Sequence, residues 1–326
     1  MEPGYRSYAL QTAHYFDRPH TGIPREPVDG PAAWRGDALA DEAWAHPLEA
    51  PELDEIEAAL ATAEATGKPL AHWERDDFPL PGLTARIDAW REELLSGRGF
   101  LLLRGVPVAR FGRERSERFF WGLGLHLGVP GAQNPAGDLL GHVEDTGDDA
   151  DDPQVRLYRT SADIAYHCDA ADAVGLLCLG KGVRGGASRI ASSVTVWNEL
   201  LRTRPDLAAR LFDPMRLDLR NEERPGMRGF IEIVPCRHAD GVLRTFYHSD
   251  YFRSVDRHAD AALPDLDREL LDAYDAIAET PGVYLDMNLE PGDVQLVSNH
   301  TIVHARTGYE DTSGARRHLL RLWLSL

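Results

Sequence analysis

Short apolar segments separated by turn residues fill the chain from about residue 155 to its end. Candidate strands follow one another at residues 155–159, 174–179, 188–192, 230–235, 243–247, 283–287, 293–298 and 318–325. So many short strands bounded by Gly, Pro and Asp favour a β-sandwich or a β-barrel. Two helical stretches, 195–212 and 264–279, interrupt the series. We therefore expect a mainly β fold with helical decoration, of the α+β type.

The N-terminal part of the chain supplies helices around one strand. Residues 51–66 and 83–96 carry apolar residues at helical spacing, and a further helix is expected near 113–127. The apolar run 100–104 predicts a buried strand. Residues 1–50 lack a clear period but contain several aromatic residues, so we expect an irregular arm packed on the domain.

Charge and cysteine content narrow the classes of partner. The formal net charge of −18 argues against nucleic acid, because a phosphate backbone needs a basic protein face. The three cysteines, Cys168, Cys178 and Cys236, show no CxxC spacing and argue against a disulfide framework or a structural zinc site. The sequence also lacks a signal-peptide pattern and an apolar run of about 18 residues. We expect a cytoplasmic protein with a small-molecule partner and no nucleic-acid or membrane partner; homo-oligomer formation is left open.

The tripeptide His167-Cys168-Asp169 is a candidate metal-binding step. If residues 165–169 are extended, the side chains of His167 and Asp169 point to the same face and can reach one ion. His304, which follows a strand-like segment and a bend at 300–303, is the best third ligand. Two imidazoles and one carboxylate on one octahedral face are typical of non-haem iron(II) oxygenases. The tripeptide alone is weak evidence, because a core histidine beside a turn aspartate is its commonest interpretation.

Two arginines follow His304 at short range and predict a carboxylate site. Arg317 lies 13 residues beyond His304 (317 − 304), and Arg321 lies four further on. Leu320, Leu322 and Leu324 alternate with Arg321 and Trp323, so both arginines are expected on the face opposite the leucines. A guanidinium group binds a carboxylate through two parallel hydrogen bonds, which suits 2-oxoglutarate. Internal ion pairs to Glu310 or Asp311 are the alternative.

Six sequence blocks then occur in a characteristic order: GFLLLRGVPV, QNPAGDLLGHV, VRLYRTSADIAYHCDAADAVGLLCL, GGASRIASSVTVWNEL, PGDVQLVSNHTIVHART and RRHLLRLWL. Together they resemble the taurine dioxygenase-like, or clavaminate synthase-like, family of iron(II)- and 2-oxoglutarate-dependent oxygenases. The resemblance covers residues 97–326. It implies a distorted double-stranded β-helix with a cupin-like jelly-roll core, and Fe(II), 2-oxoglutarate and O2 as cofactor and cosubstrates. We expect a single oxygenase domain over residues 1–326, in which residues 1–96 pack on a core of residues 97–326.

The resemblance also implies roles for individual residues. Arg317 matches the arginine that grips the distal carboxylate of 2-oxoglutarate, and Ser188 falls where many members place a threonine on the same carboxylate. Arg321 matches a second arginine that meets an acidic group of the substrate in several members. The implied iron ligands are His167, Asp169 and His304. Because halogenating relatives replace this carboxylate with a small residue, Asp169 favours hydroxylation.

Further substrate candidates are Gln133, Asn134 and His142, in a polar block that the family places near the substrate, and Tyr166, beside the metal step. Asn299 and His300 are expected to orient His304. The predicted reaction is oxidation, foremost hydroxylation, of an unactivated C–H bond in a small amino-acid-like or acidic substrate, with release of succinate and CO2. Desaturation, cyclisation and epimerisation stay open. A non-redox cupin-type metal enzyme and a non-catalytic binding protein are disfavoured by the triad and the two arginines.

Overall fold

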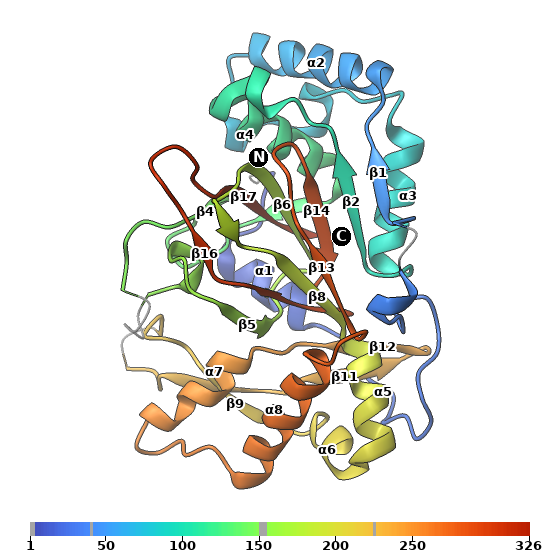
Figure 1. The fold of residues 1–326 in the computed structure, drawn as a ribbon, viewed down its shortest axis with the longest axis vertical. Coiled ribbons are helices and arrows are strands. Elements are labelled where there is room, and N and C mark those ends of the chain that lie inside the picture. Colours follow the sequence, from blue (N-terminus) through green and yellow to red (C-terminus); the bar gives the residue numbers. More distant parts are fainter. Residues whose placement is uncertain (1–3, 40–41, 150–154, 224–225) are drawn as a thin grey trace.

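Two β-sheets lie between two layers of helices in the computed structural model, which describes residues 4–39, 42–149, 155–223 and 226–326 (Figure 1). The larger sheet has the order β1 (Ala45–Pro47), β2 (Phe100–Arg104), β14 (Val294–Ser298), β6 (Ala173–Gly180), β17 (His318–Ser325) and β3 (Val129–Gly131), and β4 (Leu140–Glu144) also pairs with β17. The smaller sheet has the order β13 (Tyr284–Met287), β8 (Ser188–Ser192), β15 (Ile302–Arg306) and β5 (Ile164–His167).

Side chains from both sheets meet in the interior. Phe100, Val174 and Trp323 of the larger sheet belong to one buried cluster with Ile190 and Ile302 of the smaller sheet. This arrangement is the jelly roll expected from the sequence. A site built between the sheets is therefore surrounded by packed apolar side chains.

Strand β17 shows how the sequence directs its side chains. Leu320, Leu322 and Leu324 pack in the cluster formed with the N-terminal helices, whereas Leu319 and Trp323 face the interior between the sheets. The alternation predicted from the sequence is thus confirmed. The same alternation directs Arg321, and Arg317 immediately before the strand, toward the barrel interior.

Helices cover the outer faces of both sheets. The outer face of the larger sheet is covered by α2 (Ala50–Ala65), α3 (Thr84–Leu95) and α4 (Val108–Leu127). The smaller sheet is covered, in the lower half of Figure 1, by α5 (Ser193–Thr203), α6 (Pro205–Arg210), α7 (Ser249–Arg253) and α8 (Asp265–Ala278).

The remaining strands pair as β9 (Met215–Asp218) with β10 (Phe230–Ile233), β11 (Cys236–Ala239) with β12 (Val242–Thr245), and β7 (Arg184–Gly185) with β16 (Tyr309–Glu310). No helix within the described ranges is both long enough and apolar enough to cross a bilayer.

Three expectations about elements were wrong. The expected helix 195–212 is two helices, because Pro205 cannot continue a helix and begins α6 instead. The expected strand 155–159 is irregular and ends in a short 3-10 turn, Leu157–Arg159. The expected irregular arm of residues 1–50 contains a helix, α1 (Tyr8–Phe16). Its buried residues are Gln11 and Tyr15, and because one of them is polar the sequence shows no apolar period.

Candidate active site

The three predicted metal ligands come together where β5 and β15 pair. His167 and His304 are direct partners in this antiparallel pair, so their side chains lie side by side on one face. Asp169 follows β5 by two residues and is buried. The centroids of the His167 and His304 rings are 4.2 Å apart, and His304 Nε2 lies 3.7 Å from Asp169 Oδ2.

This cluster has the properties of a metal site. One donor atom from each residue lies within 4.8 Å of the other two. Asp169 Oδ2 is buried and makes no hydrogen bond in the described part of the chain, so a cation would satisfy it. Burial, reinforced by His167, lowers the pKa of His304 to about 3 and keeps this imidazole neutral. Two neutral imidazoles and a carboxylate fit iron(II).

The charge on Asp169 is maintained by its neighbours. Burial opposes ionisation, but the nearby guanidinium group of Arg321 is the largest opposing influence, and the pKa of Asp169 is held below its ordinary value. Arg321 Nη1 lies 3.7 Å from Asp169 Oδ1. The carboxylate is therefore ionised at neutral pH, as a metal ligand must be.

A buried asparagine fixes the turn that carries Asp169. Asn299 Oδ1 accepts from the backbone N–H of Asp169 (3.0 Å), and Asn299 Nδ2 donates to the carbonyl of Ala171 (3.0 Å). His300 is paired through Nε2 with Asp172 Oδ1 at 2.9 Å. Asn299 and His300 therefore hold the turn of residues 169–172. The sequence had led us to expect that they would orient His304.

Arg321 stands between the metal cluster and the interior aromatics. Its Nε donates to Gln133 Oε1 at 2.7 Å, and Gln133 Nε2 donates back to the carbonyl of Arg321 at 2.8 Å. The guanidinium carbon lies 4.5 Å from the centroid of Tyr158 and 5.5 Å from that of Trp323. Gln133 therefore positions Arg321 and is itself buried.

Two more arginines, Arg306 at the end of β15 and Arg317 directly before β17, lie close to Tyr309. The guanidinium carbons of Arg306 and Arg317 lie 5.0 and 5.2 Å from the Tyr309 ring centroid. Arg317 Nη1 and Arg306 Nη1 are buried without a hydrogen-bond partner among the described residues. Burial lowers the pKa of Arg317, and burial together with Arg317 lowers that of Arg306 to about 10. Two buried cations of this kind call for an anionic partner.

The internal ion pairs considered as an alternative do not occupy Arg317. Glu310 pairs with Arg184, and Asp311 Oδ1 accepts from the backbone N–H of Arg317 at 2.9 Å. Gly186 adopts φ +74°, and a Cβ there would lie 2.8 Å from Arg317 Nε. The glycine pair before β8 is thus needed for the close approach of this loop to Arg317.

Ser188 lies on β8, where its Cα pairs with that of Arg306. Its hydroxyl is buried and donates to Gln295 Oε1 at 2.8 Å. A carboxylate only accepts hydrogen bonds, so the hydroxyl must turn away from Gln295 to reach one.

A pocket opens at the metal cluster. Its lining combines His167, Asp169 and Arg321 with residues from the loop before β5, the turn after β9 and helix α7: Val155, Arg156, Leu157, Tyr158, Ile164, Arg220, His248, Asp250 and Tyr251. The His248 ring stacks on Tyr251 with centroids 3.6 Å apart, and its backbone bridges to His167. The sequence did not single out Arg156, Arg220 or Asp250, because no local pattern marks them and tertiary packing alone brings them to the site.

Three sequence candidates lie elsewhere. The Tyr166 hydroxyl donates to the carbonyl of Ala278 (3.1 Å), because alternation along β5 turns this side chain toward α8 and away from His167. His142 lies on the outer face of β4, beside α4. Asn134 bonds Asp138 (2.7 Å) and lines a separate hollow next to the pocket.

Comparisons with known proteins agree with this architecture. FR-33289 synthase of Streptomyces rubellomurinus is 31% identical over 314 residues, which span 93% of this chain and 92% of that protein. The structure of an asparagine oxygenase with Fe(II), 2S,3S-3-hydroxyasparagine and succinate aligns with a TM-score of 0.70 at 16% identity, covering 86% of this chain and 93% of that chain. The non-haem iron oxygenase OrfP with Fe and alpha-ketoglutaric acid aligns with a TM-score of 0.62 at 16% identity, covering 86% and 93%.

The family model described as "Taurine catabolism dioxygenase TauD, TfdA family" matches residues 66–323. This range includes His167, Asp169, His304, Arg317 and Arg321. The chain therefore belongs to the TauD/TfdA family and is a non-haem iron, 2-oxoglutarate-dependent dioxygenase with a jelly-roll core.

Proposed function

We propose that His167, Asp169 and His304 hold the iron and that the enzyme hydroxylates an unactivated C–H bond of a small acidic, amino-acid-like substrate. The observation that carries this proposal is the shared pocket: His167, Asp169 and the buried cation Arg321 form parts of one wall. A substrate anchored at Arg321 would lie against the metal cluster. Bound iron would supply dioxygen activation coupled to oxidation of 2-oxoglutarate to succinate and CO2.

Arg317 is proposed to hold the distal carboxylate of 2-oxoglutarate, with Arg306 beside it. Their buried nitrogens without protein partners in the described chain support this role. The hydroxyl of Ser188 would join them by leaving Gln295. A buried anion site of this kind also argues against a non-redox metal enzyme, which has no need of a dicarboxylate.

The charges of the pocket support an acidic substrate that also carries an amine. Arg156, Arg220 and Arg321 line it. Arg156 Nε already donates to Glu222 Oε1 at 2.8 Å, so Arg321 is the proposed anchor for a carboxylate or a similar anion. Asp250 lies on the same lining and could pair with an ammonium group. The solved structures in complex with 2S,3S-3-hydroxyasparagine and with (3S)-hydroxy-L-Arg are consistent with such a substrate. Desaturation, cyclisation or epimerisation of the same kind of molecule is the second possibility.

The test is a screen for substrate-stimulated succinate release by the iron-loaded enzyme. Each amino acid or organic acid is paired with its neutral amide or methyl ester. We expect stimulation by at least one free acid, accompanied by a product one oxygen atom heavier, and far weaker stimulation by the matched neutral compound. Equal stimulation by acids and their neutral partners would contradict the anionic anchor.

A further inference from the structure

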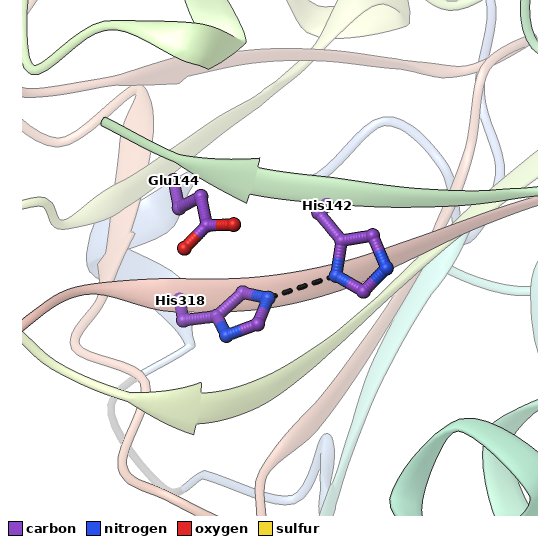
Figure 2. Close-up of side chains that lie close together, drawn as sticks. All are labelled: His142, Glu144 and His318. Carbon is purple, nitrogen blue, oxygen red and sulfur yellow. Dashed lines mark hydrogen bonds between the residues drawn. The ribbon is translucent and has the colours of Figure 1, made fainter. Parts of the chain in front are cut away.

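A second cluster of metal-binding side chains lies on the outer face of the larger sheet. His142 and Glu144 are two residues apart on β4 and so point to the same side of the strand. His318 begins β17, where its Cα pairs with that of Glu144. Figure 2 shows the three side chains converging, and one donor atom from each lies within 4.8 Å of the others.

This cluster is separate from the proposed iron site. Leu320, the partner of His142 across the strands, packs in the cluster formed with α2, α3 and α4. His318 alternates with Arg317 and Leu319, whose side chains are buried on the interior side of β17. The sheet itself therefore lies between His142 and the barrel interior.

We propose that His142, Glu144 and His318 bind a divalent transition cation of the zinc type. Two imidazoles and one carboxylate suit zinc, whereas magnesium and calcium prefer oxygen ligands alone. Three ligands from two neighbouring strands would also tie β4 to β17.

The two imidazoles are nearly in place for one ion. His142 Nδ1 and His318 Nε2 are 2.9 Å apart and share a hydrogen bond. Nitrogen ligands at about 2.0–2.1 Å from a tetrahedral zinc ion lie roughly 3.3 Å from each other, so a small separation of the rings suffices.

Glu117 of α4 lies near His142 Nε2, the ring nitrogen of His142 that does not bond His318. His142 Nε2 lies 3.8 Å from Glu117 Oε1 and 3.4 Å from Arg113 Nη2. When Nδ1 binds a cation, the ring proton moves to Nε2, where Glu117 can accept a hydrogen bond and Arg113 cannot. Arg113 Nε donates to the same Glu117 oxygen at 2.8 Å, but the Arg113 side chain is 61% exposed and can turn toward solvent, which leaves this oxygen to His142. A carboxylate behind a ligating histidine fixes its tautomer and strengthens binding.

The test measures bound zinc in metal-stripped, full-length protein dialysed against micromolar free zinc(II). We expect two equivalents in the wild type, one in His142→Ala/His318→Ala, one in His167→Ala/His304→Ala, and none when all four residues are changed. The matched control His72→Ala/His238→Ala changes histidines outside both clusters and should keep two. A His142→Ala/His318→Ala variant that binds as much zinc as the wild type would overturn the proposal.

Milder variants keep the test independent of folding. Glu144→Gln removes one ligand charge and should weaken zinc binding at this site about tenfold or more. Glu117→Gln should weaken it about 10- to 100-fold, whereas Arg113→Ala should leave it equal or tighter. Circular dichroism of the metal-free variants checks that each is folded. Unchanged zinc affinity in both Glu144→Gln and Glu117→Gln would contradict the site.

Discussion

The guanidinium carbons of Arg306 and Arg317 lie 5.0 and 5.2 Å from the Tyr309 ring centroid, and no ion pair to either arginine occurs within the described residues. Like charges in a buried space are unfavourable, as the pKa of Arg306, lowered by burial and by Arg317, reflects. A dianionic cosubstrate would relieve this repulsion. The repulsion between Arg306 and Arg317 therefore supports the proposal that these two residues bind an anionic ligand.

Replacement of Arg317 tests this view. Arg317→Ala should raise the KM for 2-oxoglutarate roughly 10- to 100-fold, because a charge-assisted hydrogen-bonded contact contributes about 1.5–3 kcal/mol. Arg317→Lys should recover part of the loss by keeping the charge. Arg184→Ala, at an exposed arginine paired with Glu310, is the control and should leave the KM unchanged. An unchanged KM in Arg317→Ala would move the carboxylate site elsewhere.

The proposed iron ligand Asp169 gives a second prediction at this scale. Asp169→Ala should abolish iron-dependent succinate formation and reduce bound iron, since two imidazoles alone hold the ion weakly. The exposed Asp260→Ala serves as the control and should retain both. Full turnover by a folded Asp169→Ala enzyme would refute the ligand assignment.

The sequence predicted those site residues that local patterns mark. The spacing of His167 and Asp169 and the alternation along β17 bring the predicted ligands and arginines to one interior. Tyr166 was a substrate candidate because it is next to His167 in the sequence. Neighbouring side chains on a strand point to opposite faces, so Tyr166 points away from His167. Arg156 and Arg220 could not be predicted, since only the packing of distant loops carries them to the pocket.

At the scale of elements, the contact between β17 and α4 supports the interior face of the strand. A Cβ at Gly124 of α4 would lie 2.3 Å from Leu322 Cδ2, so helix and sheet approach more closely than a side chain permits. Arg321 precedes Leu322 and therefore points to the opposite, interior face of the strand. Helix α4 thus supports the strand that carries Arg321, the proposed substrate anchor.

A double-mutant cycle tests this packing. Leu322→Ala should lower the free energy of unfolding by about 2–5 kcal/mol through cavity formation, and Gly124→Ala by about 1–3 kcal/mol through overpacking. Combined, they should cost less than the sum, because the new methyl group occupies part of the vacated space. Leu10→Ala, at an exposed leucine, should have little effect. Strict additivity in denaturant unfolding would contradict the contact.

The predicted boundaries of helices and strands were accurate where the local sequence marks them. They were inaccurate where tertiary contacts determine the structure. The expected helices near α2, α3 and α8 formed because their apolar period is plain. Strand β15, which carries His304, replaced part of an expected bend because its partners β5 and β8 supply hydrogen bonds from distant residues. Pairing of this kind is not visible in a local window.

At the scale of the molecule, a buried carboxylate joins the hairpin that carries Arg220 to the segment after α7. Asp218 accepts from Arg257 Nε (2.7 Å), from Ser254 Oγ (2.7 Å) and from the backbone N–H of Arg220 (2.9 Å). Burial opposes its charge, but Arg257, His258 and Ser254 outweigh it and hold the pKa of Asp218 well below its ordinary value. The pocket wall thus depends on an ion pair outside the pocket.

This carboxylate makes stability depend on pH. Because its pKa is depressed in the folded chain, its contribution is complete above the unfolded value near 4 and is lost as the pH falls below it. Asp218→Asn should cost about 3 kcal/mol at pH 7, and the difference from the wild type should shrink toward pH 3. The exposed Asp240→Asn should track the wild type throughout. A constant difference between pH 7 and pH 3 in denaturant unfolding would refute the role of this charge.

An anaerobic crystal structure of the enzyme with iron(II) and 2-oxoglutarate, with anomalous data at the iron edge, would locate both the metal and the cosubstrate. We predict an iron peak between His167, Asp169 and His304, and 2-oxoglutarate with its distal carboxylate on Arg317. Iron bound without these three residues, or a distal carboxylate held away from Arg317, would contradict the account.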